Sequence, residues 1–179
     1  ILVDYDTKWR TQAYINRNTF DAVPTYSKHS AYLMSALGSQ DGASKYASIT
    51  RPGLHVLTMG LIEEIIDYSE IAESFKINML DTNARTNYNF IIYDVPFEVL
   101  NNYGETLINN ADNILWICDS SNWGLMKMIL SITNIENTNS MDAIYRRSKV
   151  LFNRFRGIDK ILGEKVNNLK DVMISGDNM

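Results

Sequence analysis

Asn89-Phe90-Ile91-Ile92-Tyr93-Asp94-Val95-Pro96 is the stretch that decides the fold. Its apolar run is nearly continuous rather than alternating, which is typical of a strand that helices cover on both faces. Asp94 follows the run directly, and Pro96 then stops further strand pairing because proline has no backbone N–H to donate. The stretch therefore predicts a buried strand over residues 90–93 with a carboxylate fixed at its carboxyl end.

Further apolar runs of this kind recur along the chain, bounded by polar or turn residues, at residues 1–3, 54–57, 114–118, 150–152 and 172–174. Helical periodicity separates them, in segments that begin near residues 67–69, after residues 120–122, and over residues 27–37. In the first of these segments, Ile71, Phe75 and Met79 form the expected buried face. The alternation predicts an α/β fold with a doubly wound, mostly parallel sheet and helices on both of its faces.

Composition narrows the class of protein. The chain has 179 residues, of which 45% are hydrophobic, and this is enough for a buried core. No linker rich in Pro, Gly or Ser divides the sequence, so we expect a single domain over residues 1–179. No apolar run approaches the roughly 20 residues of a membrane-spanning helix, and the first residues do not resemble a signal peptide, so we expect a cytoplasmic protein. Cys118 lies within an apolar run and is expected to be a buried hydrophobe.

Charge and histidine spacing argue against two kinds of site. The net charge of −4 does not favour a polyanion as partner. One basic cluster is present, which comprises Arg146, Arg147, Lys149, Arg154, Arg156 and Lys160. We interpret this cluster as a solvated face and do not expect nucleic acid to bind it. Neither His29 nor His55 has a His or Cys partner at ligand spacing, so we expect no zinc site.

Sheets of this kind bind ligands beyond the carboxyl ends of their strands. Carboxylates occur at these positions, directly after the predicted strands. Asp4 and Asp6 come directly after residues 1–3 and, two positions apart, lie on the same side of an extended segment. Such a pair can coordinate a metal or orient water, but aspartate is also common where strands become loops. Asp94 has two open interpretations as well, a magnesium-associated carboxylate or a residue that begins a turn.

The order of these segments resembles the MinD/ParA family of ATPases and its pilus-localising relatives CpaE and TadZ. The resemblance is carried by Ile1-Leu2-Val3-Asp4-Tyr5-Asp6, Tyr88 to Pro96, Pro52 to Gly60, Ala111 to Ile117 and Ser148 to Arg154. It implies a P-loop NTPase-like sheet that is incomplete in this chain. It also implies a switch that binds and hydrolyses ATP with Mg²⁺ and positions a cellular assembly such as a pilus or secretion machine.

The same resemblance assigns roles to individual residues. Asp6 would position the attacking water, Asp4 would support the magnesium and switch region, and Asp94 would hold magnesium through water. Asn153, together with Arg154, would recognise the adenine base. As partners the resemblance implies a second copy in a homodimer and the proteins of the localised assembly, with peripheral attachment at the membrane or cell pole through segments outside this chain.

The sequence departs from the family in one major respect, because no Gly-x-x-x-x-Gly-Lys-[Ser/Thr] loop occurs in it. We expect that loop, and the strand that carries it, upstream of Ile1, and we expect ATPase activity only of a protein that includes them. Phe97-Glu98 stands where the family usually has a glycine. Two alternatives stay open: a receiver module that accepts phosphate in an acidic pocket, and a scaffold that has lost hydrolysis.

Overall fold

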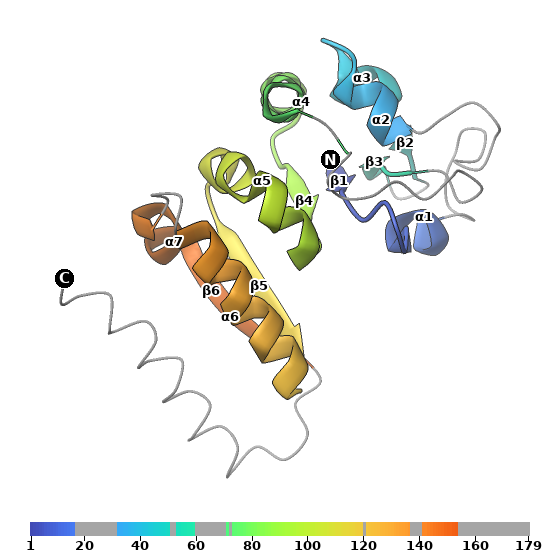
Figure 1. Ribbon diagram of the computed structural model, residues 1–179. Coiled ribbons are helices and arrows are strands. Elements are labelled where there is room, and N and C mark those ends of the chain that lie inside the picture. The colour runs from blue at the N-terminus through green and yellow to red at the C-terminus, as the bar shows by residue number, and fades with distance from the viewer. Residues whose placement is uncertain are drawn as a thin grey trace.

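The computed structural model describes residues 1–16, 32–50, 53–59, 71, 73–119, 121–136 and 141–153. These residues form an α/β fold in which strands and helices largely alternate (Figure 1). In chain order the elements are β1 (Leu2–Asp4), α1 (Thr11–Asn16), α2 (Tyr32–Leu37), α3 (Gly42–Tyr46), β2 (Ser48–Ile49), β3 (His55–Leu57), α4 (Ser74–Asn87), β4 (Ile92–Asp94), α5 (Phe97–Asn110), β5 (Ile114–Asp119), α6 (Asn122–Glu136), α7 (Met141–Arg147) and β6 (Ser148–Asn153).

The strands form two sheets within the described part of the chain. One sheet has the order β2-β3-β1-β4, and β5 and β6 form the other. β1 is parallel to both β3 and β4, and β5 is parallel to β6, whereas β2 is antiparallel to β3. The predicted α/β class is confirmed, and the strands pair in parallel except for β2 with β3. The described strands form two small sheets and do not join into one continuous sheet.

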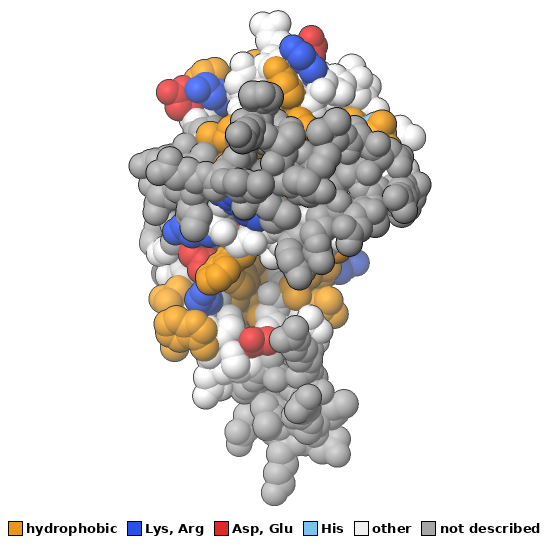
Figure 2. Space-filling model, turned by 90° about the vertical axis from the view of Figure 1, so that its right-hand side faces the viewer, with side chains coloured by type: hydrophobic (Ala, Val, Ile, Leu, Met, Phe, Trp, Pro, Cys, Tyr) orange, Lys and Arg blue, Asp and Glu red, His pale blue; other side chains and the backbone are white. Residues whose placement is uncertain are grey.

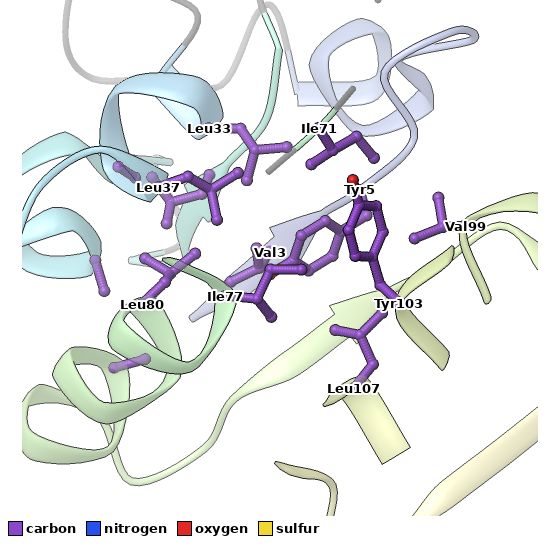
Figure 3. Close-up of a cluster of buried hydrophobic side chains, with 14 of the residues drawn as sticks. Val3, Tyr5, Leu33, Leu37, Ile71, Ile77, Leu80, Val99, Tyr103 and Leu107 are labelled. Atoms are coloured by element: carbon purple, nitrogen blue, oxygen red, sulfur yellow. The ribbon is translucent and has the colours of Figure 1, made fainter. Parts of the chain in front are cut away.

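The main core surrounds β1, because this strand is paired on both edges and covered by helices. Val3 and Tyr5 are fully buried and pack against side chains from α4 and α5, including Ile77, Tyr103 and Leu107 (Figure 3). Burying an aliphatic or aromatic side chain of this size contributes about 1.5–3 kcal/mol. The strand that ends in the candidate carboxylate Asp4 is therefore held by the main core.

Helix α5 connects this core to a second one beside β5. Tyr103 and Leu107 belong to the main core, whereas Ile108 belongs to the cluster around Trp116. Phe97, at the start of α5, stacks on Trp116 with ring centroids 6.2 Å apart. The second cluster also includes Cys118, Met128 and Ile144, which confirms the expected burial of the cysteine. One helix thus packs against both sheets.

Two details of the sequence prediction were wrong. Helix α4 begins at Ser74, so Ile71 lies outside it and Phe75 is 59% exposed. The buried face of α4 consists instead of Ile77, Leu80, Asp81 and Ala84. The expected buried strand over residues 90–93 is shifted and is less buried than predicted, because β4 spans Ile92–Asp94 and both Phe90 and Ile92 are exposed. In both cases a large apolar side chain before the element, Ile71 or Phe90, was taken as part of it.

The remaining predicted elements divide into those that the structure describes and those that it does not. Strands form at the expected places near residues 1–3, 54–57, 114–118 and 150–152, and α6 covers the helix expected after residues 120–122. Helix α2 coincides with the end of the helix expected over residues 27–37, whose residues 27–31 lie outside the described chain. Residues 172–174 also lie outside it.

The surface carries several separate groups of hydrophobic side chains, as the face drawn in Figure 2 illustrates. Among the described helices, none has the length and apolar character needed to cross a membrane. The basic cluster is described only in part, since residues 154, 156 and 160 lie outside the described chain. Arg146 and Lys149 are exposed, and Arg147 donates a hydrogen bond to the Ala111 carbonyl.

Candidate functional site

Two carboxylates meet at the carboxyl ends of neighbouring parallel strands. Asp4 is the last residue of β1 and Asp94 the last residue of β4, and the two are directly opposite in the register. The strand ends stay joined one residue further on, where the Tyr5 N–H donates to the Asp94 carbonyl at 2.9 Å. The sequence placed both carboxylates at strand ends, and the structure brings them together at one edge of one sheet.

Asp4 is fully buried and both of its carboxylate oxygens accept hydrogen bonds. Oδ1 accepts from the backbone N–H of Asp6 at 2.9 Å, and Oδ2 accepts from the Thr58 hydroxyl at 2.9 Å. Burial raises the pKa of Asp4 from 3.8 to about 6; the two hydrogen bonds oppose the rise, while the nearby charges of Asp94 and Asp6 add to it. Asp4 therefore exchanges its proton close to neutral pH, and a cation beside the pair would favour its ionised form.

Asp6 organises the loop that follows β1. Its Oδ1 accepts from the Trp9 N–H at 2.9 Å, and its carbonyl accepts from the Arg10 N–H at 3.1 Å. Arg10 is buried and its Nε donates to the Thr7 carbonyl at 3.0 Å. Arg10 also adopts a φ of 54°, in the left-handed region that costs non-glycine residues energy. This loop is thus a tight, internally bonded turn that follows Asp4 and is tied to its carboxylate by the Asp6 N–H.

Asp94 is half-buried, and its Oδ2 accepts from the side-chain amide of Gln12, on α1, at 3.0 Å. Gln12 and Thr58 are therefore part of the site, although the sequence analysis did not identify either one. For Thr58 a signal was present, since it directly follows the apolar run that became β3. Gln12 carried no such signal, because only the path of the chain after β1 brings it to β4.

Asn153, expected to recognise the base, lies in the other sheet. It ends β6 and is opposite Asp119 at the end of β5. Asp119 accepts hydrogen bonds from the backbone and the hydroxyl of Ser121, just before α6 begins. Arg154 lies outside the described residues. The structure thus places Asn153 at a strand end, as expected, but in a different sheet from Asp4 and Asp94.

A cleft of about 1070 Å³ separates the two sheets. Its sides are β4 with its flanking residues 89–96 and the start of β5, and side chains of α5 line it as well. Asp94 and Gln12 are among its lining residues, so one carboxylate of the pair borders the cleft, whereas Asp4 is buried behind it and is not part of the lining. The apolar residues that border it include Ile92, Leu115 and Ile117, each more than half exposed.

The side chains at the carboxylate pair supply few ligands, so they suit a cation that keeps waters or phosphate oxygens as its other ligands. Within the described residues, no group of three or more His, Cys, Asp or Glu side chains is arranged to hold a metal ion. Both oxygens of Asp4 are engaged in hydrogen bonds, which leaves Asp94 as the better placed carboxylate for a metal. Mg²⁺ fits such a site, because it commonly keeps several waters and takes one or two carboxylates together with phosphate oxygens.

Comparison with protein-family models gives no match for this chain, and comparison with curated protein sequences gives none either.

Proposed function

We propose that this chain forms the magnesium and switch side of an ATP-binding positioning protein of the MinD/ParA/TadZ kind. The observation that carries the proposal is the pairing of Asp4 with Asp94 at the carboxyl ends of adjacent parallel strands. That edge is where open α/β sheets bind their ligands. The proposal also includes a doubly wound P-loop-like sheet, a cytoplasmic location and a homodimer that organises a larger protein assembly.

Each carboxylate has a distinct role in this proposal. Asp94 holds Mg²⁺, directly or through water, while the bound cation neutralises charge on the phosphates. Asp4 is a positioning residue, because its oxygens hold the Asp6 backbone and the Thr58 hydroxyl. Asp6, in the tight turn that follows Asp4, orients the attacking water. The phosphates themselves require backbone and lysine donors that this chain does not supply.

Asn153 and Arg154 remain the proposed contacts for the base. Support for Asn153 is its place at the carboxyl end of β6, a strand that lies on the far side of the cleft from β4. A nucleotide that reached both groups would have its phosphates near Asp94 and its base beyond the end of β6. This arrangement requires the two sheets to act together as one binding edge.

The test is isothermal titration calorimetry, in which Mg²⁺·ATP is titrated into the protein as its gene encodes it. We expect binding that depends on magnesium and that Asp94→Asn weakens about tenfold or more, because one charge-assisted ligand is lost. Asp41→Asn is the matched control, since Asp41 is exposed and its side chain makes no capping hydrogen bond. It should leave the affinity unchanged.

Two other outcomes would favour the scaffold or the receiver module over the proposed ATP-binding protein. Absence of magnesium-dependent ATP binding in the encoded protein would contradict the proposal and favour a scaffold. Covalent labelling of Asp94 by acetyl phosphate, detected by mass spectrometry and abolished by Asp94→Asn, would favour the receiver module instead. Equal loss of affinity in Asp94→Asn and Asp41→Asn would show that the carboxylate pair is not the binding site.

A further inference from the structure

We propose that the outward face of α6 is an interaction surface for a second copy of this chain, which packs its own α6 there in antiparallel orientation. Three exposed side chains define this surface, which we call the α6 stripe: Trp123, Met126 and Leu130. The contact is separate from the carboxylate pair, and it requires neither nucleotide nor metal.

The α6 stripe consists of large apolar side chains that the fold leaves uncovered. Trp123, Met126 and Leu130 are 70%, 51% and 56% exposed. Met128, on the opposite side of the helix, is fully buried, and Leu125 packs against the same cluster beside β5 (Figure 1). A helix that is apolar on its buried side and on its outer side has one face left for a partner, and Trp and Met are enriched where proteins meet.

The spacing of the stripe fits a helix as its partner. The three residues are three and four positions apart, and Thr133, which is also exposed, follows three positions later. Positions that alternate between three and four residues apart repeat every seven, and they form the seam along which two helices pack at a small crossing angle. From Trp123 to Thr133 the seam spans about 15 Å, at about 1.5 Å per residue. The occupant is therefore an α-helix with a seam of similar length.

A second copy of α6 matches this seam in side-chain size. In an antiparallel pair related by a two-fold axis, Met126 faces the partner's Leu130 and Trp123 faces the partner's Thr133. The largest side chain of the seam thus meets the smallest, and the two of intermediate size meet each other, so the facing layers interdigitate. A parallel pair would oppose two Trp123 side chains and leave a gap between two Thr133 side chains. Size matching therefore favours the antiparallel pair.

The charge beside the stripe is balanced within the chain. Among the described side chains of α6, Lys127 alone is charged. Its Nζ lies 2.9 Å from Oε1 of Glu98, on α5, and 5.9 Å from the centre of the Trp123 ring. The ion pair offsets the lysine charge, and the cation–π contact favours one orientation of the indole. The stripe is therefore an apolar surface with a neutralised border, as a contact between two like copies requires.

Sedimentation velocity of the protein as its gene encodes it, with EDTA and without nucleotide, measures the dimer. The seam is short, so the interface belongs to the weak class, and we expect monomer below about 1 μM and dimer above about 100 μM. Met126→Glu and Leu130→Lys each place a charge in the seam and should raise the dissociation constant about tenfold or more. Phe75→Glu, at an exposed position of α4, is the matched control and should leave it unchanged. Circular dichroism checks that each variant keeps its helix content.

A mixture of the two charged variants tests the orientation of the helices. In the antiparallel pair the introduced glutamate faces the introduced lysine, so an equimolar mixture of Met126→Glu and Leu130→Lys should dimerise about tenfold or more tightly than either variant alone. A parallel pair brings the two introduced charges into no such contact, so a mixture without recovery would overturn the antiparallel arrangement. Wild type that stays monomeric at about 100 μM, or equal weakening by Phe75→Glu, would overturn the α6 stripe as the surface. Neither measurement involves ATP, so its outcome is independent of the calorimetric test.

Discussion

Replacing Asp4 by asparagine should stabilise the protein at neutral pH, although it removes a residue of the candidate site. The pKa of Asp4 is raised from 3.8 to about 6, mainly by burial. The folded protein therefore holds this proton more tightly than the unfolded chain, and ionisation of Asp4 favours unfolding. The penalty is absent below the unfolded pKa of 3.8, grows as the pH rises toward 6, and is complete above that pH.

The size of the effect follows from the shift. At about 1.4 kcal/mol per pKa unit, the ionised carboxylate costs about 3 kcal/mol near pH 7.5 and about 1 kcal/mol near pH 4.5. Asparagine avoids this cost and keeps the main contacts. Its carbonyl oxygen can accept from the Asp6 N–H, and its amide can donate to the Thr58 hydroxyl, which also accepts hydrogen bonds.

Urea denaturation of wild type and Asp4→Asn near both pH values measures the difference. We expect the variant to be more stable by up to about 3 kcal/mol near pH 7.5, with a gain that falls to about 1 kcal/mol near pH 4.5. Asp41→Asn, at an exposed position, should show no such pH-dependent gain. A gain of equal size at both pH values, or a loss of stability near pH 7.5, would refute the assignment of a buried, strained charge to Asp4.

Two packing predictions follow from close contacts and burial. Gly42→Ala should destabilise the fold by about 1–3 kcal/mol in urea denaturation, because a Cβ at Gly42 would lie 2.0 Å from the carbonyl oxygen of Ala36. Gly38→Ala, whose Cβ would have only ordinary contacts, is its control, and equal effects of the two changes would contradict the steric argument. Leu80→Ala should cost about 2–5 kcal/mol because the side chain is fully buried, whereas Leu130→Ala, at an exposed position, should change the thermal midpoint little.

The sequence located elements well where the local pattern was unambiguous. Near-continuous apolar runs marked the strands that became β1, β5 and β6. The same runs overstated the burial of β5, in which Leu115 and Ile117 are 56% and 51% exposed. The pattern failed at element ends. Ile71 and Phe90 each extended an apolar pattern by a residue or more, yet Ile71 is buried outside α4 and Phe90 is exposed before β4. A hydrophobic side chain in the sequence therefore fixes neither where a helix or strand begins nor whether that side chain is buried.

Some residues of the candidate site were predictable from the sequence, and others were not. Aspartates after apolar runs indicated carboxylates at strand ends, and this placed Asp4 and Asp94 correctly. Gln12 was not predictable, because only the path of the chain after β1 brings it to Asp94. The apolar run before Thr58 marked a strand end, but it did not show which carboxylate Thr58 would meet. Asn153 shows the opposite case, since its strand end was expected but its separation from Asp94 by the cleft depends on which strands pair.

The stretch from Asn89 to Pro96 by itself determined a strand that ends in a carboxylate, because apolar continuity and proline act locally. The tertiary structure alone decided three things: that β1 pairs with β4 so that Asp4 meets Asp94, that burial brings the pKa of Asp4 to about 6, and that β4 and β5 leave an open cleft between them. Strand order, burial and the facing of two open edges arise from contacts between distant segments, and no local pattern encodes them.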